Sequence, residues 1–331
     1  MKWAIDSPVK STVYYTLIDS GFDIEHFRVL NGKYNHKANS KSSGIYAQTR
    51  RNVHRIEKGI SASFLKKRNV FAKEYIEETI NGVEKLLDSK YIDTPFHKWS
   101  FDVLNSYFSL ITLDDYFNNL KNKWDEIVKK HPLKNGENIV NYSPFQHNKL
   151  PVSNISFTEL DTLFKRRHSV RWYNDDEVDV QLIKKAVGSA LASPSACNRQ
   201  PFEVLYITGK KLEELKPLKL GFEMFSDSIK AFIFIVGDLS SYIEERDKHL
   251  IYIDGSLFAM SLMLALEALG ISSCPINYPD VTNIDNKVQD ILNLEGYQKG
   301  VMLMSVGYAS DNSPIPFSAK KGVNEIFKEI N

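Results

Sequence analysis

A basic segment, KRRHSVRWY, covers residues 165–173 and contains three arginines, a lysine, a histidine and a serine. Guanidinium groups bind phosphate and carboxylate oxygens in a bidentate geometry. The segment therefore predicts an anion site. A solvated basic turn at the end of a helix is an equally simple interpretation of these residues alone.

A loop of small and polar residues, PSACNRQP, spans residues 194–201 and directly precedes a predicted strand at 202–208. A plain connection between a helix and a strand needs fewer residues. Short side chains would let a flat ligand approach the backbone, which makes the loop a candidate binding surface. An ordinary surface loop is the alternative.

Two further segments contain candidate ligand contacts. Pro275 interrupts a predicted strand within SSCPINYPD, residues 272–280. Proline inside a strand is unusual and indicates that the backbone turns its polar groups toward a ligand. Lys320 and Lys321 follow a proline-rich stretch near the end of the sequence. They are either a second source of positive charge or solvated surface.

Helices and strands alternate around these segments. Helices are expected at 156–170 and 179–193, and strands at 202–208, 231–238, 271–278 and 301–309. A long helix at 255–270 is apolar nearly all round, so both of its faces should be buried. This order predicts an α+β fold with a sheet of about four or five strands.

The first half of the chain has mainly helical periodicity, at residues 69–88 and 100–131, after a predicted loop at 31–44. Residues 132–156 are rich in Asn, Pro and Ser and are expected to be a linker. We therefore divide the chain into a mostly helical accessory region, 1–150, and a second domain, 151–331. In RRNVHRIEKGIS, residues 50–61, Arg51 and Arg55 share a helix face that should end at Gly59. That face is either simply charged or binds an anionic group.

Composition narrows the function classes. The 331 residues carry a formal net charge of +1, which argues against a general nucleic-acid-binding protein. Two cysteines, Cys197 and Cys274, imply no disulfide framework and favour a reducing compartment. Each is either a small buried residue or a redox-sensitive thiol. The most apolar stretch, residues 255–271, contains Glu267 and is interpreted as a buried helix rather than a membrane span. We expect a cytoplasmic protein without a metal site.

In their order and spacing, these segments resemble the nitroreductase family of FMN-dependent oxidoreductases over roughly residues 157–331. The sequence matches the family's basic segment with Arg167, His168, Ser169 and Arg171, and its small-residue loop with Pro194, Ser195, Asn198, Gln200, Pro201 and Phe202. An apolar helix ending in Ala-x-Gly, a strand with Pro275, a strand containing Val306, Gly307 and Tyr308, and the basic pair Lys320 and Lys321 complete the pattern.

The resemblance implies a nitroreductase-like fold, with a mainly antiparallel mixed sheet flanked by helices, and FMN as cofactor. Arg167 with Lys320 or Lys321 would bind the FMN phosphate, and His168 and Ser169 the phosphate and ribityl oxygens. Arg171 would lie at the N1/O2 edge of the ring. Pro194, Ser195 and Ala196 would pack on the ring, and Asn198 and Gln200 would contribute polar contacts. The backbone at Pro275, Ile276 and Asn277 would face flavin N5.

The implied activity is hydride transfer from NADH or NADPH through flavin N5 to an unknown acceptor, with no side chain acting as general base. A homodimer with the flavin at its interface is expected, and the long apolar helix would be buried there. The run HRIEKG, residues 54–59, resembles the N-terminal extension of family members associated with surface polysaccharide synthesis. The alternative function is a flavin- or sugar-binding module without nicotinamide-driven turnover.

The sequence departs from the family pattern in two places. It has Asn277 and Tyr278 where many members have glycine or Glu-Gly after the proline, so the residues on the redox face differ. The segment 238–255 is also too short for the helical excursion that covers the pocket in some members. Access should therefore be open, or covered by the N-terminal region.

Overall fold

The computed structural model describes residues 2–38, 42–66, 70–89, 94–133 and 140–330. Its second half is built on a four-stranded sheet of β1 (Phe202–Ile207), β2 (Ala231–Asp238), β4 (Gln298–Gly307) and β3 (Ser272–Ile276), in that spatial order. Every neighbouring pair is antiparallel. The predicted α+β fold with a mainly antiparallel sheet is confirmed.

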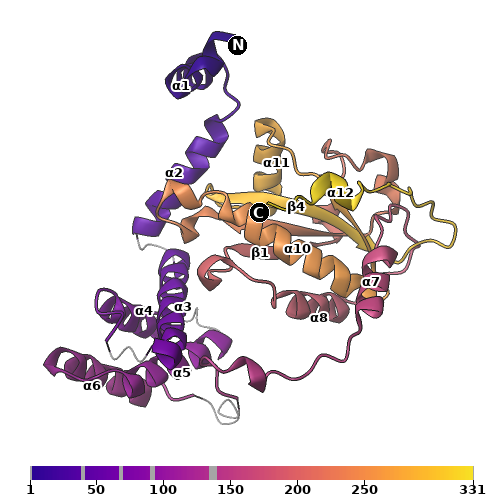
Figure 1. Cartoon of the computed structure of the whole chain (residues 1–331). Coiled ribbons are helices and arrows are strands. Elements are labelled where there is room, and N and C mark those ends of the chain that lie inside the picture. The colour runs from indigo at the N-terminus through magenta and orange to yellow at the C-terminus, as the bar shows by residue number, and fades with distance from the viewer. Residues whose placement is uncertain (1, 39–41, 67–69, 90–93, 134–139, 331) are drawn as a thin grey trace.

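Helices cover both faces of this sheet (Figure 1). On one face, α8 (Val180–Ala190) and α10 (Leu250–Ala268) pack with residues of β2 and β4 into an apolar core. On the other face, α9 (Gly209–Leu215) and α11 (Thr282–Leu292) enclose a second core. Residues 231–237 of β2 are buried, as expected for a central strand covered on both sides.

The long apolar helix is only partly buried within one chain. Ile253, Leu257 and Met260 on α10 are 53%, 44% and 37% exposed, whereas Phe258 and Leu262 are fully buried against the sheet. Burial of both faces, which the sequence predicts, is therefore not achieved by this chain alone. By length and composition this helix could cross a membrane, but that is weak evidence because core helices of soluble proteins pass the same test.

Four helices of the first half share a separate core: α3 (Ser42–Lys66), α4 (Ile76–Asp88), α5 (Thr94–Leu110) and α6 (Asp115–Lys130). They form a group beside the sheet, seen in Figure 1. Aromatic side chains fill this core, and Trp124, Tyr107 and Phe101 are almost completely buried. The first half is helical, as expected. The boundary at residue 150 stays a prediction.

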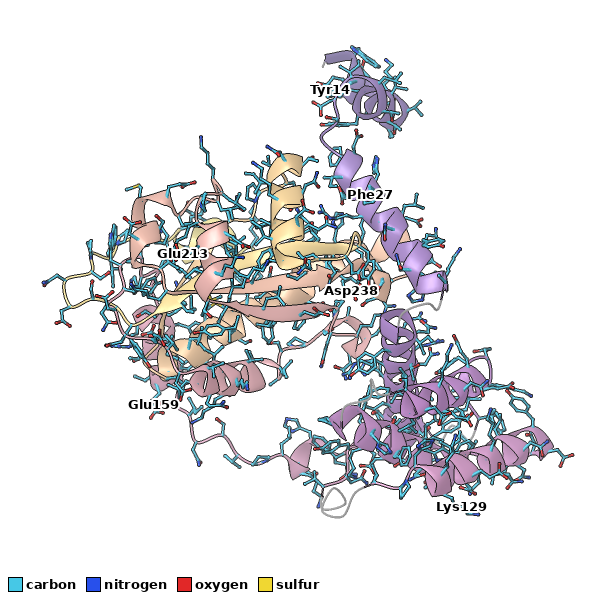
Figure 2. The ribbon with its side chains drawn as sticks, turned by 180° about the vertical axis from the view of Figure 1, so that it is seen from behind. Tyr14, Phe27, Lys129, Glu159, Glu213 and Asp238 are labelled. Atoms are coloured by element: carbon cyan, nitrogen blue, oxygen red, sulfur yellow. The ribbon has the colours of Figure 1, made fainter. Side chains whose placement is uncertain are left out.

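The predicted loop at 31–44 is wrong. Helix α2 (Asp23–Ala38) runs through most of it, and α3 begins at Ser42; positions 39–41 lie outside the described residues. Contacts with the second half stabilise α2: Arg28 forms a buried ion pair with Asp285 at 2.7 Å. A side chain at Gly32 would meet the Leu239 backbone at 2.7 Å. Asp238, labelled in Figure 2, lies where the sheet meets this helix.

Two other helix ends differ from expectation. Helix α3 continues through Gly59 to Lys66, because the ring of Phe71 packs directly on the glycine and would be 2.4 Å from an added Cβ. Helix α4 begins at Ile76, later than its periodicity predicts. The expected linker is largely irregular where it is described, with one short turn at His147–Lys149; positions 134–139 lie outside the described residues. The short N-terminal elements η1 (Lys2–Asp6) and α1 (Pro8–Leu17) precede α2.

Candidate active site

The basic segment lies along the open edge of β3. It begins where α7 (Phe157–Arg166) ends, and a parallel bridge joins Ser169 to Ser273. The Val170 amide donates to the Ser273 carbonyl at 3.2 Å, and the Val170 side chain is buried. These contacts fix the side chains on either side of Val170 next to the end of the sheet.

Two guanidinium groups at this edge lack a counter-charge. Arg167 and Arg171 make no ion pair with any carboxylate in the part of the chain that the structure describes. Arg171 Nη1 has one long contact, 3.4 Å from the Ser169 carbonyl oxygen. The neighbouring Arg166, by contrast, is paired with Glu267 at 2.8 Å. An uncompensated pair of arginines is the donor set that an anionic ligand requires.

The thiol of Cys274 reports how close these groups are. Burial raises the pKa of Cys274, whereas Arg171, the Ser169 hydroxyl and Arg167 act in the opposite direction. Cys274 is buried and unpaired, and so is not an exposed reactive thiol.

A small cavity of about 270 Å³ opens beside Arg171. Its lining includes the predicted redox-face residues Pro275, Ile276 and Asn277, together with Lys219. The structure therefore brings Arg171 and these three residues together, as the sequence predicts. Arg167 and Ser169 also lie at this strand edge, since both are close enough to Cys274 to influence its pKa. His168 Nδ1 is bonded to the Arg166 carbonyl oxygen at 2.9 Å, which orients the ring.

The small-residue loop adopts an unusual backbone. Cys197, Asn198 and Gln200 have φ values of 53°, 52° and 51°, in the left-handed region. Asparagine tolerates this region, but each such non-glycine residue costs on the order of 1 kcal/mol or more. Three within four positions need support from elsewhere in the fold.

Asp254 of α10 provides part of that support. The residue Asp254 is 2% exposed. Its carboxylate oxygen Oδ2 accepts hydrogen bonds from Ser195 Oγ at 2.6 Å and from the Ala196 backbone amide at 3.0 Å. The backbone amide of Gln200 in turn donates to Ser195 Oγ at 2.8 Å, which joins the two ends of the loop. Burial raises the pKa of Asp254, and the bonds from Ser195 and Ala196 oppose that shift.

Helix α3 holds the loop from the other side. Buried Arg50 donates from Nε to the Asn198 carbonyl oxygen at 2.8 Å, and its guanidinium lies 5.3 Å from the centre of the Trp99 ring. Arg199, also buried, pairs with Asp247 at 3.0 Å. The helical region therefore contacts the loop of its own chain, and His36 of α2 contacts the Ser240 carbonyl oxygen at 2.7 Å in the segment 238–255.

The two halves of the predicted site lie at opposite edges of the sheet. The loop precedes β1, and the basic segment borders β3, and β1 and β3 are the two outer strands. One chain therefore does not bring Asn198 or Gln200 together with Arg171. The expectation that a second copy supplies the loop stays a prediction.

Lys320 and Lys321 lie in an exposed C-terminal tail that contains one short helix, α12 (Val323–Ile326). Among residues 2–38, 42–66, 70–89, 94–133 and 140–330, no hydrogen bond or ion pair joins either lysine to the basic segment. Pro194 lies at the exposed start of the loop, and Ala196 donates its backbone amide to Asp254. The roles of these four residues as ligand contacts stay predictions.

Three residues that shape the site were not identified from the sequence: Asp254, Arg50 and Arg199. Asp254 had a usable signal, because a carboxylate inside an otherwise apolar helix must find hydrogen-bond donors when it is buried. Arg50 and Arg199 carried no local signal, since each acts across a tertiary contact.

Comparison with known proteins supports the resemblance. A protein-family model described as Nitroreductase family matches residues 164–227 and 224–308. An iodotyrosine deiodinase of Hydra vulgaris is 23% identical over 247 residues, covering 62% of this chain and 87% of the relative. A Streptococcus pyogenes protein provisionally named NAD(P)H nitroreductase is 28% identical over 207 residues, covering 53% and 99%. A solved FMN-dependent nitroreductase of Clostridium difficile has a TM-score of 0.44 at 22% identity, covering 51% of this chain and 98% of its own.

Proposed function

We propose that this protein binds FMN and uses it to transfer hydride from NADH or NADPH to a small-molecule acceptor, which is reduced. The premise is that residues 164–308 form a nitroreductase family domain. The observation that carries the proposal is the pair of uncompensated arginines, Arg167 and Arg171, at the open edge of β3. Structural ion pairs would have neutralised them, as Glu267 neutralises Arg166.

The donor set at this edge fits FMN. Arg167, Ser169 and His168 would hold the phosphate and the ribityl oxygens, with Lys320 or Lys321 arriving from the exposed tail. FMN supplies the hydride chemistry at N5 when it is bound. The protein's part is to bind and orient it and to set the charge around it.

Arg171 would act on the energetics of reduction. Its guanidinium lies beside the cavity lined by Pro275, Ile276 and Asn277, where a fixed positive charge stabilises negative charge that develops on reduction. Because the surroundings are partly buried, this charge is screened less than one in water. No side chain is needed as a general base.

The homodimer belongs to the same proposal. The loop at the β1 edge and the arginines at the β3 edge are too far apart in the topology to contact one ligand within a chain. A two-fold pairing would place the loop of one copy on the β3 edge of the other. The exposed residues Ile253, Leu257 and Met260 of α10 would then be covered.

The test is spectroscopic. Purified protein mixed with FMN should retain flavin through gel filtration and should migrate as a dimer. The bound flavin should bleach under anaerobic conditions with NADH or NADPH and recover its absorbance when an acceptor is added. An acceptor panel should include a nitroaromatic and an iodotyrosine, because both reaction types occur among the names of the relatives. Protein that takes up no FMN overturns the proposal. Flavin that binds but is reduced by neither nicotinamide favours the binding module without turnover.

A further inference from the structure

A cavity of about 750 Å³ lies between the helical region and the loop side of the sheet domain. Helices α3 and α4 form one wall, and the segment from Ser241 to Asp247, with Arg199, forms the other. Its volume is typical of a site for a small organic ligand. The lining mixes charged groups with apolar ones such as Ile45, Tyr116 and Ile243.

Arg51 is the arginine of this cavity that has no partner among the described residues, and Lys37 and Lys85 of the lining likewise make no ion pair there. It makes no hydrogen bond or ion pair with the residues that the structure describes, although the other two arginines around it do have partners. Arg199 is paired with Asp247 at 3.0 Å, and Arg55 lies 3.7 Å from the centre of the Tyr75 ring.

The environment of Arg51 is electrostatically unfavourable in the absence of an anion. Burial lowers the pKa of Arg51, and the nearby Arg199 and Arg55 act in the same direction, more strongly than Cys197 and Asp247 raise it. Glu74, Glu77 and Glu78 line the α4 side of the cavity, and Glu78 accepts from Asn52 at 3.1 Å and from Gln48 at 3.4 Å. None of them lies within ion-pair distance of Arg51.

The position of Arg51 connects the cavity to the loop. It follows Arg50, which holds the Asn198 carbonyl oxygen, and Cys197 of the loop is close enough to influence its pKa. A ligand bound to Arg51 would therefore lie next to the loop that is expected to pack on the flavin ring.

We propose that this cavity holds the acceptor, and that the acceptor carries a carboxylate or phosphate group which Arg51 binds. The inference rests on the proposed FMN function and deepens it, since it assigns a chemical class to the substrate and a recognition role to the helical region. The apolar part of the lining would contact the body of the acceptor.

The first test measures binding rather than turnover. Calorimetry on the flavin-loaded protein compares 4-nitrobenzoate with the neutral 4-nitrobenzamide, in the wild type and in Arg51→Gln, Arg51→Lys and the control Lys58→Gln. Lys58 is exposed on the same helix and does not line the cavity. Phenyl phosphate and benzoate serve as probes that separate phosphate from carboxylate recognition.

The wild type should bind 4-nitrobenzoate more tightly than the amide, and Arg51→Gln should weaken the acid by roughly 10- to 100-fold. Arg51→Lys should restore part of the affinity, and Lys58→Gln should match the wild type. Equal affinity of the wild type for acid and amide overturns the inference, and so does an Arg51→Gln variant that still prefers the acid.

The second test separates the two half-reactions by stopped flow. Reduction of the flavin by NADH or NADPH should proceed at the wild-type rate in Arg51→Gln. Reoxidation by 4-nitrobenzoate should slow; it consumes a hydride and a proton and releases the nitroso compound and water. A variant in which nicotinamide reduction slows and acceptor reoxidation does not would assign Arg51 to the nicotinamide phosphates and overturn the inference. Failure of the flavin to bind or to be reduced in the wild type would instead refute the proposed function.

Discussion

Replacement of Asp254 tests how the strained loop is held. The carboxylate accepts two hydrogen bonds on one oxygen, from Ser195 Oγ at 2.6 Å and from the Ala196 amide at 3.0 Å. Hydrogen bonds to a charged group contribute about 1.5–3 kcal/mol each, and neutral ones about 0.5–1.5 kcal/mol. Asp254→Ala removes both bonds and leaves two donors without their partner.

The two lost hydrogen bonds in Asp254→Ala therefore lower the free energy of unfolding by about 3–6 kcal/mol. Part of this loss is offset because the variant no longer has a carboxylate to desolvate on folding. We expect the free energy of unfolding to fall by a net ~2–4 kcal/mol. Asp254→Asn should stay within about 1–2 kcal/mol of the wild type, since the amide oxygen can occupy the position of Oδ2 and accept both bonds.

Urea unfolding measures the free energy of unfolding of each variant, and hydrogen exchange measures how well the loop backbone is ordered. Exchange should accelerate at residues 195–200 in the alanine variant, and FMN should dissociate more readily because the loop is no longer ordered before binding. Ser261→Ala is the matched control, since it removes a 2.7 Å bond that Ser193, in the turn after α8, makes to the same helix α10 without touching residues 195–200. Equal destabilisation by alanine and asparagine would refute the reasoning, because the hydrogen bonds could not then be the cause.

Three further outcomes follow from charged groups. Arg171→Ala should leave FMN bound but slow its reduction by roughly 10- to 100-fold, whereas Arg167→Ala should weaken FMN retention and leave the reduction of bound flavin near normal. Equilibrium binding measures the retention of FMN, and anaerobic stopped flow measures its reduction. Equal loss of flavin in both variants would contradict the assignment. Burial raises the pKa of Asp238 to about 6 from an ordinary 3.8, so the free energy of unfolding should fall as the pH rises from about 4 to about 6. Asp238→Asn should stabilise the protein at pH 7 by ~1–3 kcal/mol and have little effect below pH ~4. Parallel profiles of unfolding free energy against pH for the wild type and the variant would contradict this. Asp285→Asn should cost about 3–5 kcal/mol in urea unfolding, because it leaves buried Arg28 without its carboxylate and takes one of two carboxylates from buried Lys299, which keeps Asp280. Arg28→Met should cost less, and the reverse order would be inconsistent with the ion pair.

The periodicity of the sequence predicted the four strands and helices α7, α8 and α10 of the sheet domain because most of these elements bury continuous apolar faces, whereas α9 and α11 were not predicted. Strand β2 and helix α10 each satisfy a simple pattern, and their order gives the α+β layout. Helix α2 was missed because Asn31, Gly32 and Lys33 have turn-like composition, and the helix is stabilised by its contact with Leu239 and by an ion pair 257 residues away in the chain. No local pattern contains such contacts.

The candidate site divides in the same way. Arg167, Ser169 and Arg171 were identifiable because ligand-binding segments combine cationic and hydroxyl groups within a few residues. The support for the loop was not identifiable, because it comes from Arg50 and Asp254 on two distant helices. The left-handed backbone at Cys197 and Gln200 could not be predicted either, since neither residue type favours it.

The neighbouring positions of Arg50 and Arg51 on α3 have a thermodynamic consequence. One side chain fixes the Asn198 carbonyl oxygen, and the next faces the cavity. Linkage requires that if an anion in the cavity raises the affinity of the loop for its ligand by some factor, that ligand raises the affinity for the anion by the same factor. The helical region therefore need not contact the flavin to control how firmly it is held, and the double variant of Arg50 and Arg51 should measure that coupling as a departure from additivity.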